Sequence, residues 1–153
     1  MERACIDGEA SPPPVLKDAL RLVARAEQFS SGLSLKLQRK GYSRAEIRFA
    51  VDALGEAGML DDLRYARLWL ASRVKRKADS PRELLYALCG KGISRDTAVT
   101  ALKETLTTDA QLALLRRFVE KNGPGEPAND KAVRKRLSFD GFSAEVLDSF
   151  FDE

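Results

Sequence analysis

The sequence predicts an all-α protein made of three tandem three-helix repeats that form an elongated, curved array. The main observation is a helix–glycine–helix pattern that occurs three times, at a spacing of about 50 residues. The composition agrees with it: 44% of the 153 residues are hydrophobic, enough for a core, and 32% are charged, which suits exposed helix faces. The β-branched and aromatic residues that strands prefer are too sparse for an all-β fold.

The three copies of the pattern align on Gly41, Gly92 and Gly141. Apolar residues stand eight and four positions before each glycine, an apolar residue and a serine follow it, and more apolar residues stand six, nine and ten positions after it. The matching residues are Leu33, Leu37, Tyr42, Ser43, Ile47, Ala50 and Val51 in the first copy, Leu84, Leu88, Ile93, Ser94, Ala98, Ala101 and Leu102 in the second, and Val133, Leu137, Phe142, Ser143, Leu147, Phe150 and Phe151 in the third.

Each part of the pattern has a local physical cause. Apolar residues four positions apart share one face of a helix. A glycine ends that helix because it adopts the left-handed conformation without strain at Cβ, and the serine then caps the next helix. Ser43 with Glu46 three positions later predicts a full capping box. Each copy is therefore a helix, a glycine turn and a second helix.

A third helix is expected before each pair. In the first copy it follows the proline run at 12–14 and carries Leu16, Leu20 and Val23 on one face. In the second it covers 61–77, and in the third it covers 108–122 and ends at Asn122-Gly123 before a proline- and glycine-rich loop. Ser80-Pro81 predicts the start of the helix after 61–77. The predicted organisation is a disordered tail at 1–11 and repeats at 12–57, 58–106 and 107–153.

Aromatic residues of the third helices are expected in the core. The helix at 61–77 has an apolar face made of Tyr65, Ala66, Trp69, Leu70 and Val74. The helix at 108–122 carries Leu114, Leu115, Phe118 and Val119. A base-stacking role for Tyr65, Trp69 or Phe118 is the less favoured alternative.

The composition excludes most catalytic chemistry. There is no histidine, and Cys5 and Cys89 are the two cysteines, which form neither a disulfide framework nor a cysteine-rich metal site. Asp61 and Asp62 point about 100° apart on a helix and are expected to cap it rather than to bind a metal. We therefore expect no enzyme activity, no cofactor and no metal. No signal sequence or membrane-length apolar run is present, which predicts a cytoplasmic protein, taken here as a monomer.

Basic residues gather in three stretches, at 21–50, 73–103 and 131–136, separated by acidic segments. A solvated helix face explains any one stretch, but their recurrence favours a continuous positive surface for a polyanion or an acidic partner. The candidate binding residues are Lys36, Arg39, Lys40, Arg44 and Arg48 in the first group, Arg73, Lys75, Arg76, Lys77, Arg82, Lys91 and Arg95 in the second group, and Lys131, Arg134, Lys135 and Arg136 in the third group.

From about residue 19 to residue 151, the chain resembles the RecX family, whose members modulate the recombinase RecA. The strongest match is the segment Gly58-Met59-Leu60-Asp61-Asp62-Leu63-Arg64-Tyr65-Ala66, followed by Ser72-Arg73. Further matches are Pro81-Arg82-Glu83-Leu84, Lys91-Gly92-Ile93, and Lys36-Leu37 with Lys40-Gly41-Tyr42. The third copy, Arg136-Leu137-Ser138-Phe139-Asp140-Gly141-Phe142-Ser143, departs from the family at Phe139-Asp140, where two basic residues are usual.

The resemblance implies an array of three-helix repeats that lodges in the groove of the RecA–DNA filament. Such a protein inhibits RecA ATPase, filament extension and strand exchange in recombination, DNA repair and the SOS response, and it acts stoichiometrically. Direct contact with single- or double-stranded DNA is compatible with this role. The alternative is an independent helical nucleic-acid-binding module that acts through phosphate contacts, since a two-helix glycine turn is superficially similar to a helix-turn-helix.

Overall fold

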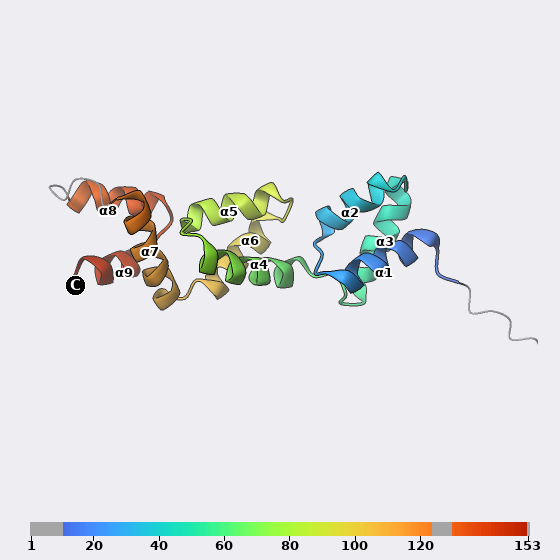
Figure 1. Ribbon diagram of the computed structural model, residues 1–153, viewed down its shortest axis with the longest axis horizontal. Coiled ribbons are helices and arrows are strands. Elements are labelled where there is room, and N and C mark those ends of the chain that lie inside the picture. The colour runs from blue at the N-terminus through green and yellow to red at the C-terminus, as the bar shows by residue number, and fades with distance from the viewer. Residues whose placement is uncertain (1–10, 124–129, 153) are drawn as a thin grey trace, which may run out of the picture. The chain divides into compact units, whose positions relative to one another are not determined.

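The computed structural model describes residues 11–123 and 130–152, and this part of the chain contains nine helices and no strand (Figure 1). The all-α prediction is therefore confirmed. The helices are α1 Pro14–Arg25, α2 Ser30–Arg39, α3 Arg44–Glu56, α4 Asp62–Arg76, α5 Pro81–Gly90, α6 Arg95–Thr105, α7 Thr108–Asn122, α8 Asp130–Phe139 and α9 Ala144–Phe151.

The chain divides into two compact units, residues 1–60 and 61–153. The first unit contains α1 to α3, and the second contains α4 to α9. The predicted tail lies outside the described residues except for Ser11, and so does the predicted loop at 124–127. The predicted repeat boundaries stay predictions, but the helices fall into three sets of three within them. We use repeat 1 for α1–α3, repeat 2 for α4–α6 and repeat 3 for α7–α9.

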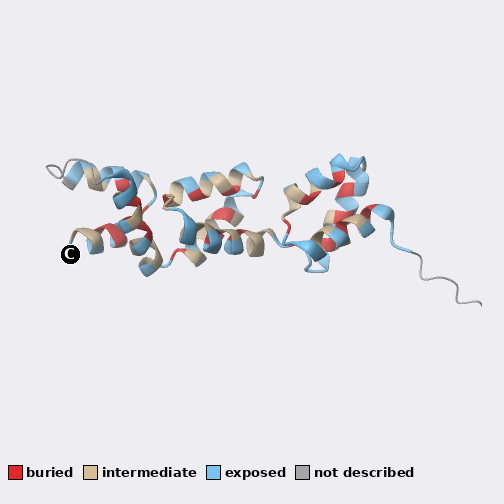
Figure 2. Cartoon of the chain, in the orientation of Figure 1, coloured by how far each residue is buried: buried red, intermediate tan, exposed pale blue. Residues whose placement is uncertain are grey.

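In the first unit, α1 and α2 pack against α3 and against each other. In α2 and α3 the buried residues include members of the predicted apolar faces. In α1 the prediction was wrong, because Val15 and Ala19 are buried while Leu16, Leu20 and Val23 are only half-buried against the core. The buried residues are Val15, Ala19, Leu33, Leu37, Ile47, Ala50, Leu54 and Leu60 (Figure 2). These eight residues form one small core that all three helices share.

In the second unit, α4 and α5 pack against α6, and α7 and α8 pack against α9. The buried apolar residues of repeat 2 are Ala66, Leu70, Leu84, Leu88, Ile93, Ala98, Ala101 and Leu106. Those of repeat 3 are Leu114, Leu115, Phe118, Leu137, Phe142, Val146 and Leu147. Among the aromatic residues expected in the core, Phe118 is buried against the Phe142 ring, whereas Tyr65 and Trp69 are only half-buried.

The three aligned glycines end their helices as predicted. Gly41, Gly92 and Gly141 have φ values of 93°, 93° and 97°, which L side chains rarely adopt. In each turn, the amide of the residue after the glycine donates to a carbonyl five residues earlier, as in a Schellman motif. For example, the Tyr42 amide lies 3.3 Å from the Leu37 carbonyl oxygen. The turn therefore pairs the last carbonyls of one helix before the next helix begins.

The predicted serine caps are also present. The Ser43 hydroxyl accepts from the Glu46 amide at 3.2 Å, while the Glu46 carboxylate accepts from the Ser43 amide at 2.7 Å. Ser94 and Ser143 accept from amides of α6 and α9 in the same way. Asp61 caps α4 through the Arg64 amide at 3.0 Å, which supports the capping interpretation of that carboxylate. The starts of α3, α4, α6 and α9 are therefore fixed by short-range side-chain bonds, whereas α1 and α2 begin without a side-chain cap.

Direct contacts join repeats 2 and 3 within the second unit. The Arg117 guanidinium on α7 donates to the Val74 carbonyl on α4. The Arg82 amide, in the first turn of α5, donates to the Asp140 carbonyl at 3.0 Å. Gly141 lies so close to this turn that a Cβ there would stand 3.1 Å from the Arg82 nitrogen. The glycine turn of repeat 3 is therefore seated on the start of α5.

Candidate interaction surface

Each repeat has a groove between its second and third helices. The groove between α2 and α3, the α2/α3 groove, has a volume of about 490 Å³, and the corresponding α5/α6 and α8/α9 grooves measure about 380 and 370 Å³. Their linings come from corresponding repeat positions. Seven residues before the aligned glycine stand Ser34, Leu85 and Arg134, and seven residues after it stand Arg48, Val99 and Asp148. The repeats therefore place different chemistry on one scaffold.

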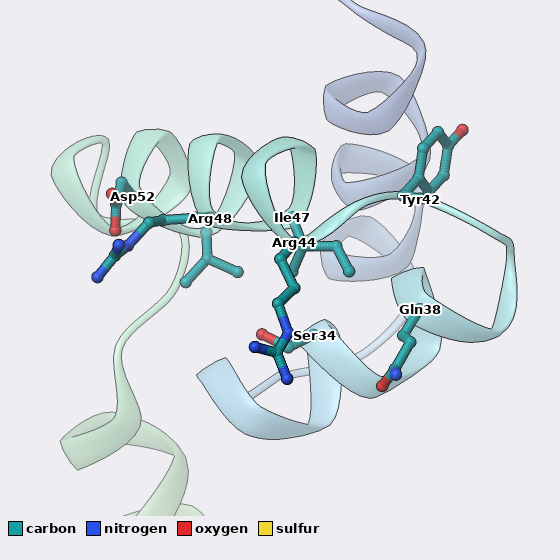
Figure 3. A pocket seen from close by; sticks show the side chains of 8 residues that line it. Ser34, Gln38, Tyr42, Arg44, Ile47, Arg48 and Asp52 are labelled. Carbon is teal, nitrogen blue, oxygen red and sulfur yellow. The ribbon is translucent and has the colours of Figure 1, made fainter.

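The α2/α3 groove is lined by polar and apolar side chains, among them two arginines and one aspartate (Figure 3). Arg44 and Arg48 stand one turn apart on α3, and the Arg44 side chain extends toward Ser34 on α2 (Figure 3). Neither arginine forms an ion pair among the described residues, although Asp52 lines the same groove one turn beyond Arg48. These two guanidinium groups can therefore contact an anionic partner without first breaking an internal ion pair.

The α5/α6 groove is largely aliphatic with a basic rim. Val99, Leu102 and Leu106 line it together with the cations Arg95 and Lys103. Repeat 3 contributes Phe139, Gly141 and Gln111 to the same groove. Because repeat 3 is seated on the start of α5, this groove is composed of two repeats.

The α8/α9 groove carries an internal ion pair across it. Arg134 of α8 bonds the Asp148 carboxylate of α9, and its guanidinium also lies 4.8 Å from the Phe151 ring centroid. Lys131 and Lys135, which line the same groove, are exposed and have no ion-pair partner among the described residues. The neighbouring cation Arg136 lies 3.9 Å from the Asp140 carboxylate. Only two of the four predicted cations of this group are therefore unengaged.

In the first predicted group, two lysines are engaged within unit 1. The Lys36 ammonium donates to the Gln28 side-chain oxygen at 2.8 Å, and Lys40 lies 3.6 Å from the Asp18 carboxylate. Arg39 is exposed without an ion pair among the described residues. In the first group, Lys36 and Lys40 thus make contacts within the chain, while the three arginines remain available to a partner.

A hydrogen-bonded pair lies beneath Lys40. The Tyr42 hydroxyl donates to the Asp18 carboxylate at 2.5 Å. This hydrogen bond, helped by the charges of Lys40 and Arg21, holds the pKa of Asp18 below its usual 3.8. The same bond raises the pKa of the Tyr42 hydroxyl above 10.0. Both shifts favour the form in which the tyrosine is neutral and the aspartate is charged.

The cations of the second predicted group make several different kinds of contact. Arg73 bonds the Asp79 carboxylate at 2.6 Å and lies 5.6 Å from the Trp69 ring centroid, while Lys91 lies 5.7 Å from the same centroid. Arg76 donates to the Ser72 hydroxyl at 2.8 Å. Lys75, Lys77 and Arg95 are exposed and have no ion pair, side-chain hydrogen bond or ring contact among the described residues.

Arg82 of the same group lies between two exposed aromatic rings. Its guanidinium carbon is 3.8 Å from the Phe139 ring centroid and 5.3 Å from the Tyr86 centroid. Tyr86, Phe139 and Lys103 are not among the binding residues predicted from the sequence. At Phe139 the sequence did contain an indication of an unusual surface, because an aromatic residue stands there where the family usually has a basic one.

Among residues 11–123 and 130–152, no group of three or more histidine, cysteine, aspartate or glutamate side chains could hold a metal ion. No helix in those ranges has the length and apolar character to cross a membrane. The predicted continuous positive surface over all three repeats stays a prediction.

Comparisons with known proteins agree with one another. Residues 61–102 match the family described as RecX, second three-helix domain. The chain is 36% identical to the regulatory protein RecX of Acidithiobacillus ferrooxidans over 91% of this chain and 88% of the relative, and 31% identical to that of Halorhodospira halophila over 90% and 86%. The fold matches a crystal structure of RecX from Lactobacillus salivarius with a TM-score of 0.68 at 18% identity, covering 90% of this chain and 92% of that one.

Proposed function

Because the chain belongs to the RecX family of regulatory proteins, we propose that it binds the filament that the recombinase RecA forms on DNA. Bound there, it inhibits RecA ATPase, filament extension and strand exchange, and so regulates recombination, DNA repair and the SOS response. The observation that carries the proposal is the similarity to relatives named regulatory protein RecX, which spans 86% and 88% of their length. The protein acts by binding as a cytoplasmic monomer, without a cofactor and without catalysis.

The contact surface consists of the predicted cations whose side chains have no ion pair, hydrogen bond or ring contact among the described residues. An exposed, unpaired cation meets a phosphate or carboxylate without the loss of an internal partner, whereas an engaged cation must first break its own contact. The proposed contact residues are Arg39, Arg44, Arg48, Lys75, Lys77, Arg95, Lys131 and Lys135. Each of the remaining predicted candidates already makes a contact within the chain.

The single-stranded-DNA-dependent ATPase of RecA, titrated with this protein at about 50 and about 200 mM salt, tests the proposal. We expect inhibition at fewer protein molecules than RecA molecules, and we expect it to persist at the higher salt because apolar and shape terms contribute. Inhibition that requires coating of the DNA and disappears with salt would favour the independent nucleic-acid-binding module. No inhibition at any ratio would overturn the proposed function.

A pair of matched variants locates the contact surface. Arg44→Glu with Arg48→Glu should raise the concentration needed for half-inhibition by at least about tenfold, because like charges would then face each other across the interface. Lys17→Glu with Arg25→Glu makes the same charge change on exposed residues of α1, outside the groove. Equal effects of the two double variants would remove the α2/α3 groove from the contact surface.

A further inference from the structure

Two aromatic side chains of the second unit are more exposed than any core role explains. Tyr86 on α5 is 57% exposed and Phe139 at the end of α8 is 68% exposed. The Arg82 guanidinium lies over both rings, 3.8 Å from the Phe139 centroid and 5.3 Å from the Tyr86 centroid, and donates to the Tyr86 hydroxyl at 3.3 Å. The three side chains form a cluster, the Tyr86–Arg82–Phe139 cluster, whose ring surface remains largely open to solvent.

The cluster forms one wall of the α5/α6 groove, which has a volume of about 380 Å³. Two further cations line that groove, Arg95 and Lys103, and none of the described residues that line it is acidic. Of the carboxylates adjacent in sequence to its lining residues, Glu83 accepts from the Ser80 amide, Glu104 pairs with Arg67 at 2.5 Å and Asp140 faces Arg136 at 3.9 Å. The groove therefore combines open aromatic faces, an aliphatic floor and uncompensated positive charge.

We propose that the α5/α6 groove binds single-stranded nucleic acid by stacking unpaired bases on the Tyr86–Arg82–Phe139 cluster. Aromatic faces and guanidinium planes are the surfaces on which unpaired bases stack, largely without regard to sequence. Arg95 and Lys103 stand eight residues apart on α6, about 12 Å along its axis, and neutralise backbone phosphates beside the stacked bases. Duplex DNA keeps its bases stacked inside and gives the rings nothing to bind.

An acidic protein segment would also be attracted to the cations of this groove. It would not, however, account for the exposed flat faces of the two rings, because carboxylates bind the positive charges and leave the ring faces unused. The observations therefore favour unpaired bases over acidic side chains. The inference does not depend on RecA, so its failure and that of the proposed function are separable.

The platform depends on how repeat 3 is seated. The Arg82 amide bonds the Asp140 carbonyl at 3.0 Å, and Gly141 approaches Pro81 and Arg82 closely because it has no side chain. These contacts place Phe139 against the Arg82 guanidinium. Where the family usually has two basic residues, this chain therefore has an aromatic ring, Phe139, and the backbone acceptor of Asp140.

The test is fluorescence anisotropy of a labelled oligothymidylate of about 16 nucleotides, titrated with the full chain in the absence of RecA. Tyr86→Ala and Phe139→Ala should each weaken binding by about fivefold to a hundredfold, the range expected for the loss of one stacked base. An abasic strand of the same length should bind more weakly than oligothymidylate and should not respond to either substitution. A duplex of equal length should also bind more weakly.

Matched controls separate stacking from loss of structure. Phe49→Ala removes a ring that is 51% exposed on α3, outside the groove, and should leave oligothymidylate binding unchanged. Phe139→Trp and Tyr86→Phe keep a ring and should retain binding. Because Phe139→Ala also removes a contact of repeat 3, Tyr86→Ala provides the independent variant, and circular dichroism confirms that both are folded.

Three results would overturn the inference. The first is oligothymidylate affinity that is unchanged by Tyr86→Ala and Phe139→Ala, because binding would then rest on phosphates alone. The second is equal affinity for the abasic strand or for the duplex. The third is binding of a labelled glutamate- and leucine-rich peptide with no measurable binding of oligothymidylate, which would assign the groove to an acidic protein segment.

Discussion

The α2/α3 groove of the first unit and the α5/α6 groove of the second are made from the same repeat positions but have different surfaces. Both carry an arginine three residues after the aligned glycine, Arg44 and Arg95. Where the first has Arg48, the second has Val99, so the same repeat position carries a charged side chain in one groove and an aliphatic side chain in the other. Only the α5/α6 groove receives side chains from another repeat within its own unit.

The buried positions differ far less than the groove positions. Eight and four residues before the glycine, both repeats bury leucines completely, and nine residues after it both bury an alanine. Side chains on adjacent helix positions point in different directions, so a buried residue and a groove residue can be neighbours in sequence. One set of positions therefore forms the core and varies little between repeats, while the neighbouring set lines the grooves and varies in charge and polarity.

The largest effect should come from a buried position of the repeat. Leu88 is fully buried, so Leu88→Ala should lower the free energy of unfolding of the second unit by about 2–5 kcal/mol. Leu85 lines the groove and is half-buried, so Leu85→Ala should cost only about 1 kcal/mol. Urea denaturation followed by the fluorescence of Trp69, the single tryptophan, measures both. Equal losses of stability for the two variants would contradict the distinction between buried positions and groove positions.

The aligned glycines should differ in their tolerance of a side chain. Gly41→Ala places a methyl group in open space and pays only backbone strain, about 1–2 kcal/mol at a positive φ. Gly141→Ala adds a contact at 3.1 Å with the Arg82 nitrogen, so its loss of stability should be larger. Thermal melting followed by circular dichroism compares the two variants. A smaller loss for Gly141→Ala would show that repeat 3 is not seated on α5 in solution.

A smaller effect distinguishes repeat 1 from the other repeats. Tyr42 bonds Asp18, whereas the matching Ile93 and Phe142 are buried apolar residues. Since the Asp18 pKa is held below 3.8, its contribution to stability is present above that pH and is lost as the pH falls through the lowered pKa.

Tyr42→Phe removes the largest cause of that shift. The loss of stability on acidification below pH 3.8 should therefore become shallower in the variant. At the alkaline end, the Tyr42 contribution is present below pH 10.0 and is lost above it, and the variant should lack this loss. Unfolding free energies over a pH series provide the measurement, and superimposable acid limbs would contradict the assignment.

The smallest effect should follow when a residue that lines the groove of one repeat is replaced by its counterpart from another repeat. Arg48→Val gives repeat 1 the residue that repeat 2 has at the same position, and Arg48 is exposed without an ion pair among the described residues. The free energy of unfolding should change by no more than about 0.5 kcal/mol. Urea denaturation of the first unit, followed by circular dichroism, measures this change. A loss of stability several times larger would show that Arg48 contributes to the fold.

Local signals made the fold predictable from the sequence. The glycine turns and the serine caps act over a few residues, and the structure contains them at the expected positions, as Gly92 and Ser43 show. The caps were also under-predicted: Ser80 forms a second capping box with Glu83. Half-burial of Trp69 was not foreseen, because helix periodicity gives the face of a residue but not how much its neighbours cover it.

The candidate site was less predictable because it depends on pairings between distant residues. The sequence gives the number of cations in each group, but not that Arg134 bonds Asp148 or that Lys40 lies against Asp18. The Tyr86–Arg82–Phe139 cluster joins residues of two repeats, and neither aromatic residue lies on a periodic apolar face. Such contacts follow from tertiary packing, which residue spacing within one repeat does not encode.

The hydrogen bond from the Arg82 amide to the Asp140 carbonyl also makes one backbone proton a reporter of domain motion. Amides in the first turn of a helix have no partner within that helix and ordinarily exchange rapidly with solvent deuterium. The Arg82 amide has a partner only while repeat 3 remains seated, so its exchange rate measures how often that repeat lifts away. A single protected amide thus gives the opening free energy of the whole junction between repeats 2 and 3.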